Sequence, residues 1–303
     1  MKPIVTPITP LPVMLRGLIG FPPNVEVLIK DETANPGGSS KARVAHSLIS
    51  EGVQTGRITA GTEVVLASSG STAIAMANET RPRGLSLRVF LPRVTPRSKV
   101  AALRGYAHVL IDEIPGSSED ARLAADQYVA SAAAVGSGVW LADQYNLPAG
   151  PRAHALGTAA EILQQTKGLV THVVVGIGTG CTATGLAMAL RRLSIGVVGV
   201  EPQAPVHGLA GLKYTPSLPP HLMPSNLRLD LLSEVQFIGD KEAFGMTQLL
   251  IRHGFRFGPS TGAVCAAARD FAARLAGKPA HLVLIGHDSA DHYPEFGEAA
   301  RVA

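Results

Sequence analysis

A lysine stands at the predicted start of a helix in the motif NPGGSSKAR, residues 35–43. Lys41 follows Ser39 and Ser40, which are typical N-cap residues, so we expect it in the first helical turn. The positive end of the helix dipole disfavours an ammonium there, and burial would lower the pKa of the amine further. A neutral lysine amine is the form that bonds covalently to a carbonyl carbon. Taken alone, the motif also suits a solvated lysine.

A second motif, ASSGSTAIAMA at residues 67–77, again leads from a predicted strand into a predicted helix. Backbone N–H groups and the hydroxyls of Ser68, Ser69 and Thr72 are expected to converge there. Such a convergence at a helix start binds a carboxylate or a phosphate. An ordinary serine-capped helix would carry the same residues.

The third motif, VVVGIGTGCTATG at residues 173–185, turns an apolar strand into a helix through small residues, which predicts a phosphate-binding loop. Dinucleotide binding is the competing interpretation. It is disfavoured because a GxGxxG motif counted from Gly176 would place its third glycine at Cys181. The acidic residue that should close the next strand is also lacking, with Glu201 the nearest candidate.

A fourth motif, FGPSTGAVCAAA at residues 257–268, contains Ser260 in a GxSxG pattern. Asp288 and His292 follow it in the order of an α/β-hydrolase triad. A nucleophile elbow needs a strand directly before the serine, whereas HGFRFGP predicts the end of a helix and a turn. A serine hydrolase is therefore the weaker interpretation.

Apolar strands alternate with helical patterns along the whole chain, which predicts an α/β fold with parallel sheets covered on both faces. Ligands of such sheets bind at the carboxyl ends of the strands. Residues 202–230 carry six prolines and little periodicity, and predict a long irregular insertion. The predicted strands are 25–31, 62–69, 87–92, 108–112, 139–145, 171–178, 195–202 and 281–288, and helices are expected from Ser40, Ser71, Thr95, Ser118, Pro151 and Ala183 and over 241–253 and 261–276.

The composition of the 303 residues excludes several classes of protein. The formal charge is only +4 with dispersed basic residues, and aromatic residues make up 5%, which disfavours a nucleic-acid partner. Cys181 and Cys265 are far apart and predict neither disulfides nor a metal site. Prolines interrupt the N-terminal segment, and no apolar run reaches membrane-spanning length, so we expect a cytoplasmic protein.

Together, in this order, the four motifs resemble those of the cysteine synthase and cystathionine β-synthase family of fold-type II pyridoxal-phosphate enzymes. The resemblance extends from about residue 10 to Tyr293. It implies an α/β fold like the tryptophan synthase β subunit, with two open parallel-sheet lobes and the active site between them. A large cofactor-binding domain of residues 1–42 and 147–303 and a small, mobile substrate-binding domain of residues 43–146 are expected. A homodimer is implied as well.

The same resemblance implies roles for particular residues. Lys41 would form a Schiff base with pyridoxal 5′-phosphate and act as acid and base at the substrate Cα, while Ser260 would face the pyridine nitrogen. Lys213, in the irregular segment, would contact a phosphate leaving group, unless it is an ordinary surface lysine. The cofactor phosphate would be held by Gly178, Thr179, Gly180, Cys181 and Thr182, and the substrate carboxylate by Ser68, Ser69, Gly70, Thr72 and Gln144.

Two positions depart from the family pattern. Ser71 stands where an asparagine usually contacts the cofactor's 3′ oxygen, and Cys181 stands where a glycine is usual. The expected activity is β-replacement on an activated serine, O-acetyl or O-phospho, with sulfide or another small nucleophile. A neutral hydroxyl at the pyridine nitrogen favours such elimination followed by addition. The alternatives are β-elimination, as in serine or threonine dehydratases, and a catalytically weak regulatory homologue.

Overall fold

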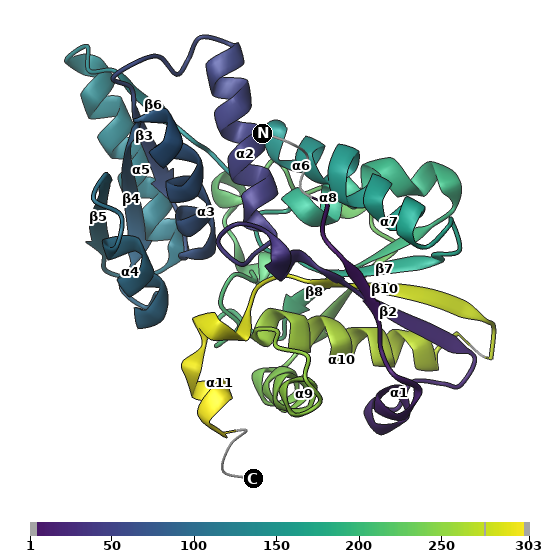
Figure 1. The fold of residues 1–303 in the computed structure, drawn as a ribbon. Helices are drawn as coiled ribbons and strands as arrows, with labels where there is room; N and C mark the ends of the chain where they lie inside the picture. The colour runs from purple at the N-terminus through teal and green to yellow at the C-terminus, as the bar shows by residue number, and fades with distance from the viewer. Residues whose placement is uncertain (1–4, 276, 300–303) are drawn as a thin grey trace.

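The computed structural model describes residues 5–275 and 277–299, and it contains two separate sheets (Figure 1). The larger sheet has the order β1-β2-β10-β7-β8-β9, and the smaller one the order β5-β4-β3-β6. Every neighbouring pair is parallel except β1 with β2. The strands are β1 (Ile8–Pro10), β2 (Val25–Asp31), β3 (Glu63–Ala67), β4 (Ser86–Pro92), β5 (Val109–Ile114), β6 (Val139–Leu141), β7 (His172–Gly176), β8 (Gly196–Pro202), β9 (Glu234–Ile238) and β10 (Ala280–Gly286).

Helices follow most strands and cover both faces of each sheet, as the alternating pattern predicts (Figure 1). A π-helical turn over His154–Thr158 joins two of them, α6 and α7. The helices are α1 (Val13–Ile19), α2 (Lys41–Gln54), α3 (Ser71–Thr80), α4 (Arg97–Arg104), α5 (Ser118–Ala134), α6 (Ala149–Ala153), α7 (Ala159–Gln165), α8 (Cys181–Leu190), α9 (Asp240–Arg252), α10 (Pro259–Ala273) and α11 (Pro294–Ala299).

All eight predicted strands and all eight predicted helices are present, with bounds that differ by up to a few residues. The predicted strand 139–145 is the largest difference, because pairing with β3 ends at Leu141. The sequence patterns missed the short elements β1, α1, β9 and α11. Residues 203–233 carry only short 3₁₀ turns, which confirms the irregular insertion.

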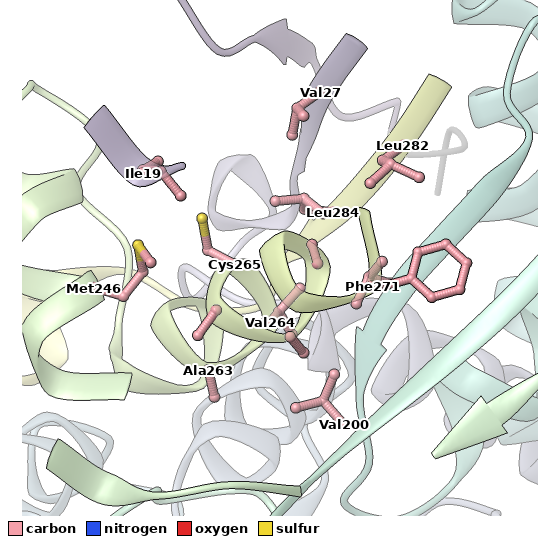
Figure 2. Packing of buried hydrophobic residues seen from close by; sticks show 14 of the residues in the cluster. Ile19, Val27, Val200, Met246, Ala263, Val264, Cys265, Phe271, Leu282 and Leu284 are labelled. Carbon is pink, nitrogen blue, oxygen red and sulfur yellow. The ribbon is translucent and has the colours of Figure 1, made fainter. Parts of the chain in front are cut away.

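The core of the larger sheet is dominated by α10, which is buried along nearly its whole length. Its Ala263, Val264 and Cys265 pack between the sheet and the helices α1 and α9 (Figure 2). Small side chains in α10 allow this close approach, and burial raises the pKa of the Cys265 thiol to about 12. Cys265 is therefore a core residue. Within the described residues, no helix is both long and apolar enough to cross a membrane.

Helix α2 stands between the two sheets (Figure 1) and packs on both α3 and α6. Its start is fixed to the larger sheet, since the Ser40 N–H donates to the His287 carbonyl oxygen at 2.8 Å. Ser40 occupies the N-cap position, but its side chain makes no capping hydrogen bond, contrary to the serine cap expected for this helix. The position of α2 places Lys41 at the junction of the two sheets.

A buried ionic cluster holds the first turn of α2 from behind. The Arg43 guanidinium donates to Glu32 and to Glu161, each at 2.7 Å, and Lys30 Nζ lies 2.7 Å from Glu161. Burial alone would raise the pKa of Glu161, but hydrogen bonds from Arg43 and Lys30 hold that pKa below its ordinary value. The cluster ties β2, α2 and α7 together next to Lys41.

Replacing Glu161 by glutamine is expected to cost about 3 kcal/mol of unfolding free energy, because it leaves two buried cations with a single carboxylate. Denaturant unfolding measures this loss. The pKa of Glu161 is lower in the folded than in the unfolded protein. Its stabilising effect is therefore complete at pH values above the pKa of the unfolded state, and it is lost as the pH falls through the pKa of the folded state. Glu113→Gln, in an exposed pair with Arg104, should cost less than about 1 kcal/mol. Equal losses in the two variants would show that the buried cluster stabilises the fold no more than an exposed ion pair does.

Candidate active site

The loops at the carboxyl ends of the strands enclose a cavity of about 510 Å³ between the two sheets. It is lined by the loops after β2, β3, β7 and β10, by the start of α10 and by the irregular segment. Residues that are far apart in the sequence therefore meet at one place. The predicted site residues that line it are Lys41, Ser69, Ser71, Thr72, Gln144, Gly178, Thr179, Gly180, Thr182, Lys213 and Ser260.

The Lys41 amine lines this cavity from the first turn of α2. Burial lowers the pKa of Lys41 from its ordinary value of 10.5, and the nearby positive charge of Lys99 acts in the same direction. Lys41 Nζ donates to Ser40 Oγ at 3.3 Å, which is a weak hydrogen bond to a neutral group. Lys41 thus has the lowered basicity that a nucleophilic amine requires.

The loop between β3 and α3 is shaped by Ser68, whose Oγ accepts hydrogen bonds from the N–H groups of Gly70 and Ala73. Ser68 and Gly70 are not among the residues that line the cavity, and the Ser68 hydroxyl is engaged with the backbone of its own loop, so its contact with a ligand stays a prediction. Ser69 and Thr72 do line the cavity, at the N-terminus of the ten-residue helix α3. The first N–H groups of a helix have no partner inside it and suit a carboxylate.

Gln144 fixes the orientation of this loop from the opposite side. Its Oε1 accepts from Thr72 Oγ1 at 2.7 Å, and its Nε2 donates to the Ala67 carbonyl oxygen at 2.7 Å. One N–H of the Gln144 amide remains for a ligand. The contact between Thr72 and Gln144 makes the loop after β3 and the loop after β6 a single surface.

The loop between β7 and α8 approaches other backbone segments too closely for larger residues. A Cβ on Gly178 would lie 2.2 Å from the Gly211 carbonyl oxygen, and one on Gly180 would lie 2.7 Å from Leu227 Cα. Gly180 also has a φ of +84°. The Thr182 hydroxyl is held 3.2 Å from His154 Nε2 at the start of α8. The loop and the helix start form a tight turn of the kind that suits an anion.

The side chain of Cys181 points away from the cavity. Its Sγ donates to the Gln144 carbonyl oxygen at 3.1 Å, and burial raises the pKa of the thiol to about 11. The Cys181 side chain therefore does not crowd the turn, and only its backbone N–H is available to an anion there. It instead joins the turn to the segment that carries Gln144.

Asp288 lies beside Ser260 and is paired with a buried lysine that the sequence did not reveal. Lys99 on α4 is almost fully buried and donates to Tyr293 Oη at 2.8 Å and to Ser71 Oγ at 2.9 Å. Asp288 lies 3.3 Å from Lys99 Nζ and 3.4 Å from Ser260 Oγ. Burial would raise the pKa of Asp288, but the Lys99 charge and the Tyr293 hydroxyl hold it below its ordinary value.

This cluster changes two expectations. Ser260 does not stand alone at its wall of the cavity, because an ionised carboxylate lies behind its hydroxyl. Ser71, which stands where the family usually has asparagine, accepts a hydrogen bond from the Lys99 ammonium. Gly70 makes this possible, because a Cβ there would lie 2.8 Å from Lys99 Cδ. The sequence offered a signal for Asp288, because it lies at the end of an apolar segment, where ligands of parallel sheets bind. No sequence pattern marked Lys99 as a site residue.

His287 also lines the cavity and was not predicted. Its Nε2 accepts the Gly176 N–H at 2.9 Å, so the ring's hydrogen belongs on Nδ1, which faces Ser40 Oγ. Burial and the positive charge of Lys41 lower the pKa of His287 to about 3. A neutral ring with both nitrogens engaged positions the loop and does not act as a base.

The residues on which dinucleotide binding and serine hydrolysis would depend have other roles in the structure. Glu201 is fully buried and accepts hydrogen bonds from the Thr215 N–H and hydroxyl, so it cannot bind a ribose. Ser260 lies in the first turn of α10 and follows no strand, as expected from the sequence. Its hydroxyl faces a carboxylate and not a histidine. Glu201 therefore does not complete a dinucleotide site, and Ser260 does not form a hydrolase triad with Asp288 and His292.

The cavity suits a polar ligand. Among the described residues, the buried hydroxyls of Ser39 and Thr95 lack a hydrogen-bond partner, and both residues line it. A reactive amine faces an anion-binding turn across the same space, and a cofactor that carries both an aldehyde and a phosphate would use both groups. Two parallel sheets with such a site between them are the architecture of fold-type II pyridoxal-phosphate enzymes.

Comparison with known proteins agrees with this class. The family model described as "Pyridoxal-phosphate dependent enzyme" matches residues 4–287, and the chain belongs to that family. It is 34% identical to a cysteine synthase of Aquifex aeolicus (strain VF5), over 90% of this chain and 84% of that protein. Cysteine synthase B of Escherichia coli (strain K12) is 33% identical, over 90% of this chain and 88% of its own.

A solved structure gives the same result at the level of the fold. The O-acetylserine dependent cystathionine beta-synthase from Helicobacter pylori superposes with a TM-score of 0.85 at 28% identity. The match covers 96% of this chain and 94% of that one. The chain is therefore a pyridoxal-phosphate dependent enzyme of fold type II and resembles the cysteine synthases over most of its length.

Proposed function

We propose that this enzyme catalyses β-replacement on O-acetyl-L-serine, with sulfide or another small nucleophile as the incoming group. The observation that carries the proposal is that Lys41, the start of α3 and the start of α8 face one cavity. The relatives that it matches are named as cysteine synthases, and the Helicobacter pylori structure as O-acetylserine dependent. O-Phosphoserine is the alternative activated serine.

Bound pyridoxal phosphate would supply an electron sink that makes the substrate Cα–H acidic. Lys41 would bond to the cofactor aldehyde at rest, and its amine would then take the proton from Cα. Burial lowers the pKa of Lys41, which favours the neutral form of this amine. The same nitrogen returns the proton once the nucleophile has added at Cβ.

The remaining residues would bind and orient. The turn from Gly178 to Thr182 would hold the cofactor phosphate through backbone N–H groups and hydroxyls. The start of α3, with Ser69, Thr72 and the free N–H of Gln144, would hold the substrate carboxylate. Ser260 would face the pyridine nitrogen. Ser71, backed by the Lys99 ammonium, would lie against the cofactor ring from the other lobe.

We also propose that residues 43–146 form a mobile domain that closes on the substrate, and that the remainder forms the cofactor-binding domain. Residues 1–4, 276 and 300–303 of that division lie outside the described residues. The separation of the two sheets supports this division. A homodimer in the cytoplasm is proposed from the family resemblance alone. Light scattering should give about twice the 31.5 kDa of one chain.

The test is a product assay with the purified holoenzyme. With O-acetyl-L-serine and sulfide we expect L-cysteine and acetate in equal amounts, without pyruvate. Pyruvate and ammonia as the main products would overturn the proposal in favour of β-elimination. No product and no change in the cofactor absorbance with any amino acid would favour a regulatory homologue. Omitting sulfide is the control, and acetate release should then stop after about one turnover.

A further inference from the structure

Two ionisable residues on different parts of the fold meet at the wall of the cavity. Lys213 comes from the irregular segment between β8 and β9, and Glu119 comes from the first turn of α5. The Lys213 ammonium pairs with the Glu119 carboxylate and donates to Ser118 Oγ at 2.8 Å. All three residues line the cavity. The lysine predicted to contact a leaving group therefore already has an anionic partner.

A second contact fixes the geometry of this pair. Arg122, one turn further along α5, donates to the Leu222 carbonyl oxygen at 2.5 Å. The Arg122 guanidinium and the Lys213 ammonium lie 4.1 and 5.3 Å from the centre of the Tyr145 ring. The start of α5 and the irregular segment are thus joined at two points around one buried aromatic ring. Lys213 cannot swing freely toward a ligand.

The pair is electrically balanced. Burial would raise the pKa of Glu119, but the charge and hydrogen bond of Lys213 hold that pKa below its ordinary value. Glu119 is therefore ionised at neutral pH and cancels the positive charge that Lys213 brings to the cavity. An anionic group that approached Lys213 would meet the carboxylate as well, at short range and with little solvent to screen it.

We propose that Glu119 determines which activated serine the enzyme accepts. By holding Lys213 in a closed pair, it leaves this wall of the cavity without net charge. An uncharged β-substituent such as an acetyl ester then fits, whereas a phosphate ester is disfavoured because it finds Lys213 already paired and meets the Glu119 carboxylate at short range. The inference rests on the proposed β-replacement on O-acetyl-L-serine and deepens it by naming the residue that selects the leaving group.

Binding of two substrate analogues to the holoenzyme tests this selection without turnover. L-2-Amino-4-phosphonobutanoate carries a phosphonate that cannot leave, and L-norvaline has an uncharged chain of matching length. Glu119→Gln keeps the shape of the side chain and removes its charge. Calorimetry should show that this variant binds the phosphonate at least about tenfold more tightly than the unmodified enzyme, with norvaline affinity unchanged. Its kcat/KM for O-phospho-L-serine relative to O-acetyl-L-serine should rise by a similar factor.

Two further variants separate charge selection from general loosening. Glu119→Gln combined with Lys213→Met should lose the gain in phosphonate affinity, since the released cation is then missing. Glu51→Gln, which breaks the pair between Glu51 on α2 and Arg152 on α6, is the matched control and should change neither affinity. Equal changes for both analogues, or none in a variant whose Tm is unaltered, would overturn the inference.

This outcome is distinct from failure of the proposed function. An enzyme that makes cysteine from O-acetyl-L-serine, but whose Glu119→Gln variant binds the phosphonate no better, retains its function and loses this selection mechanism. An enzyme that makes no cysteine loses the proposed function, whatever the binding ratio.

Discussion

Replacing Lys41 by alanine should lower the rate of β-replacement by at least about 10³-fold, because the amine that moves the Cα proton is lost. The cofactor could no longer bond covalently to the chain, so the visible absorption of the holoenzyme should shift to that of the free aldehyde. Absorbance spectra of the dialysed protein and a cysteine assay measure the two effects. Lys278→Ala, at an exposed lysine, is the control and should change neither.

Lys99 is the other lysine that could bond to the cofactor, and a second variant distinguishes it from Lys41. It is a second lysine next to the cavity, and its ammonium already contacts Ser71, Tyr293 and Asp288. We therefore expect Lys99→Met to keep the covalent bond to the cofactor while altering its absorption maximum. An unchanged spectrum in Lys41→Ala, together with loss of the band in Lys99→Met, would assign the bonding amine to Lys99 and refute the proposed site.

Replacing Gly180 by alanine should weaken cofactor binding by about 10- to 100-fold. Backbone strain at a φ of +84° and a 2.7 Å contact with the Leu227 backbone each cost on the order of 1–3 kcal/mol. The turn must move to relieve them, and its N–H groups then lose their common direction. Fluorescence titration of the apoprotein with pyridoxal phosphate measures the loss, and the Tm shows how much of it is global.

Gly56 offers a matched control for this change. Its φ of +71° is similar, but a Cβ there would meet nothing within 4 Å. Gly56→Ala should therefore lower the stability slightly through backbone strain and leave cofactor affinity unchanged. If both variants bind the cofactor equally well, the turn from Gly178 to Thr182 is not the phosphate site.

Local sequence patterns predicted the alternation of strands and helices, because the apolar period of a buried strand differs from that of a helix. They also predicted the ends of these elements, since Gly, Ser and Thr cluster where a parallel strand turns into a helix. Lys41 and the turn at Gly178–Thr182 were singled out for this reason, and the structure brings them to one cavity. The short edge elements β1 (ITP) and β9 (EVQFI) were missed, because neither is the continuous apolar run that marks a buried strand.

The charged groups that surround the ligand space were decided by tertiary structure. Lys99 contacts Asp288 and Tyr293 from 189 and 194 residues away, and Lys213 contacts Glu119 across 94 residues. No local pattern encodes such distances. Glu119, in the first turn of α5, has an ordinary local explanation as a carboxylate at the positive end of a helix dipole. Its pairing with a cation from another segment exists only in the folded chain.

The sequence by itself determined the class of chemistry, because a reactive lysine and an anion-binding turn each depend on a short stretch of chain. The fold alone decided which charges face the ligand and which cancel each other. The effective charge of a side chain depends on its burial and its partners, and both arise when distant segments pack together. Ser68 illustrates the difference: its type suggested a ligand contact, and the packed loop turned its hydroxyl to the backbone.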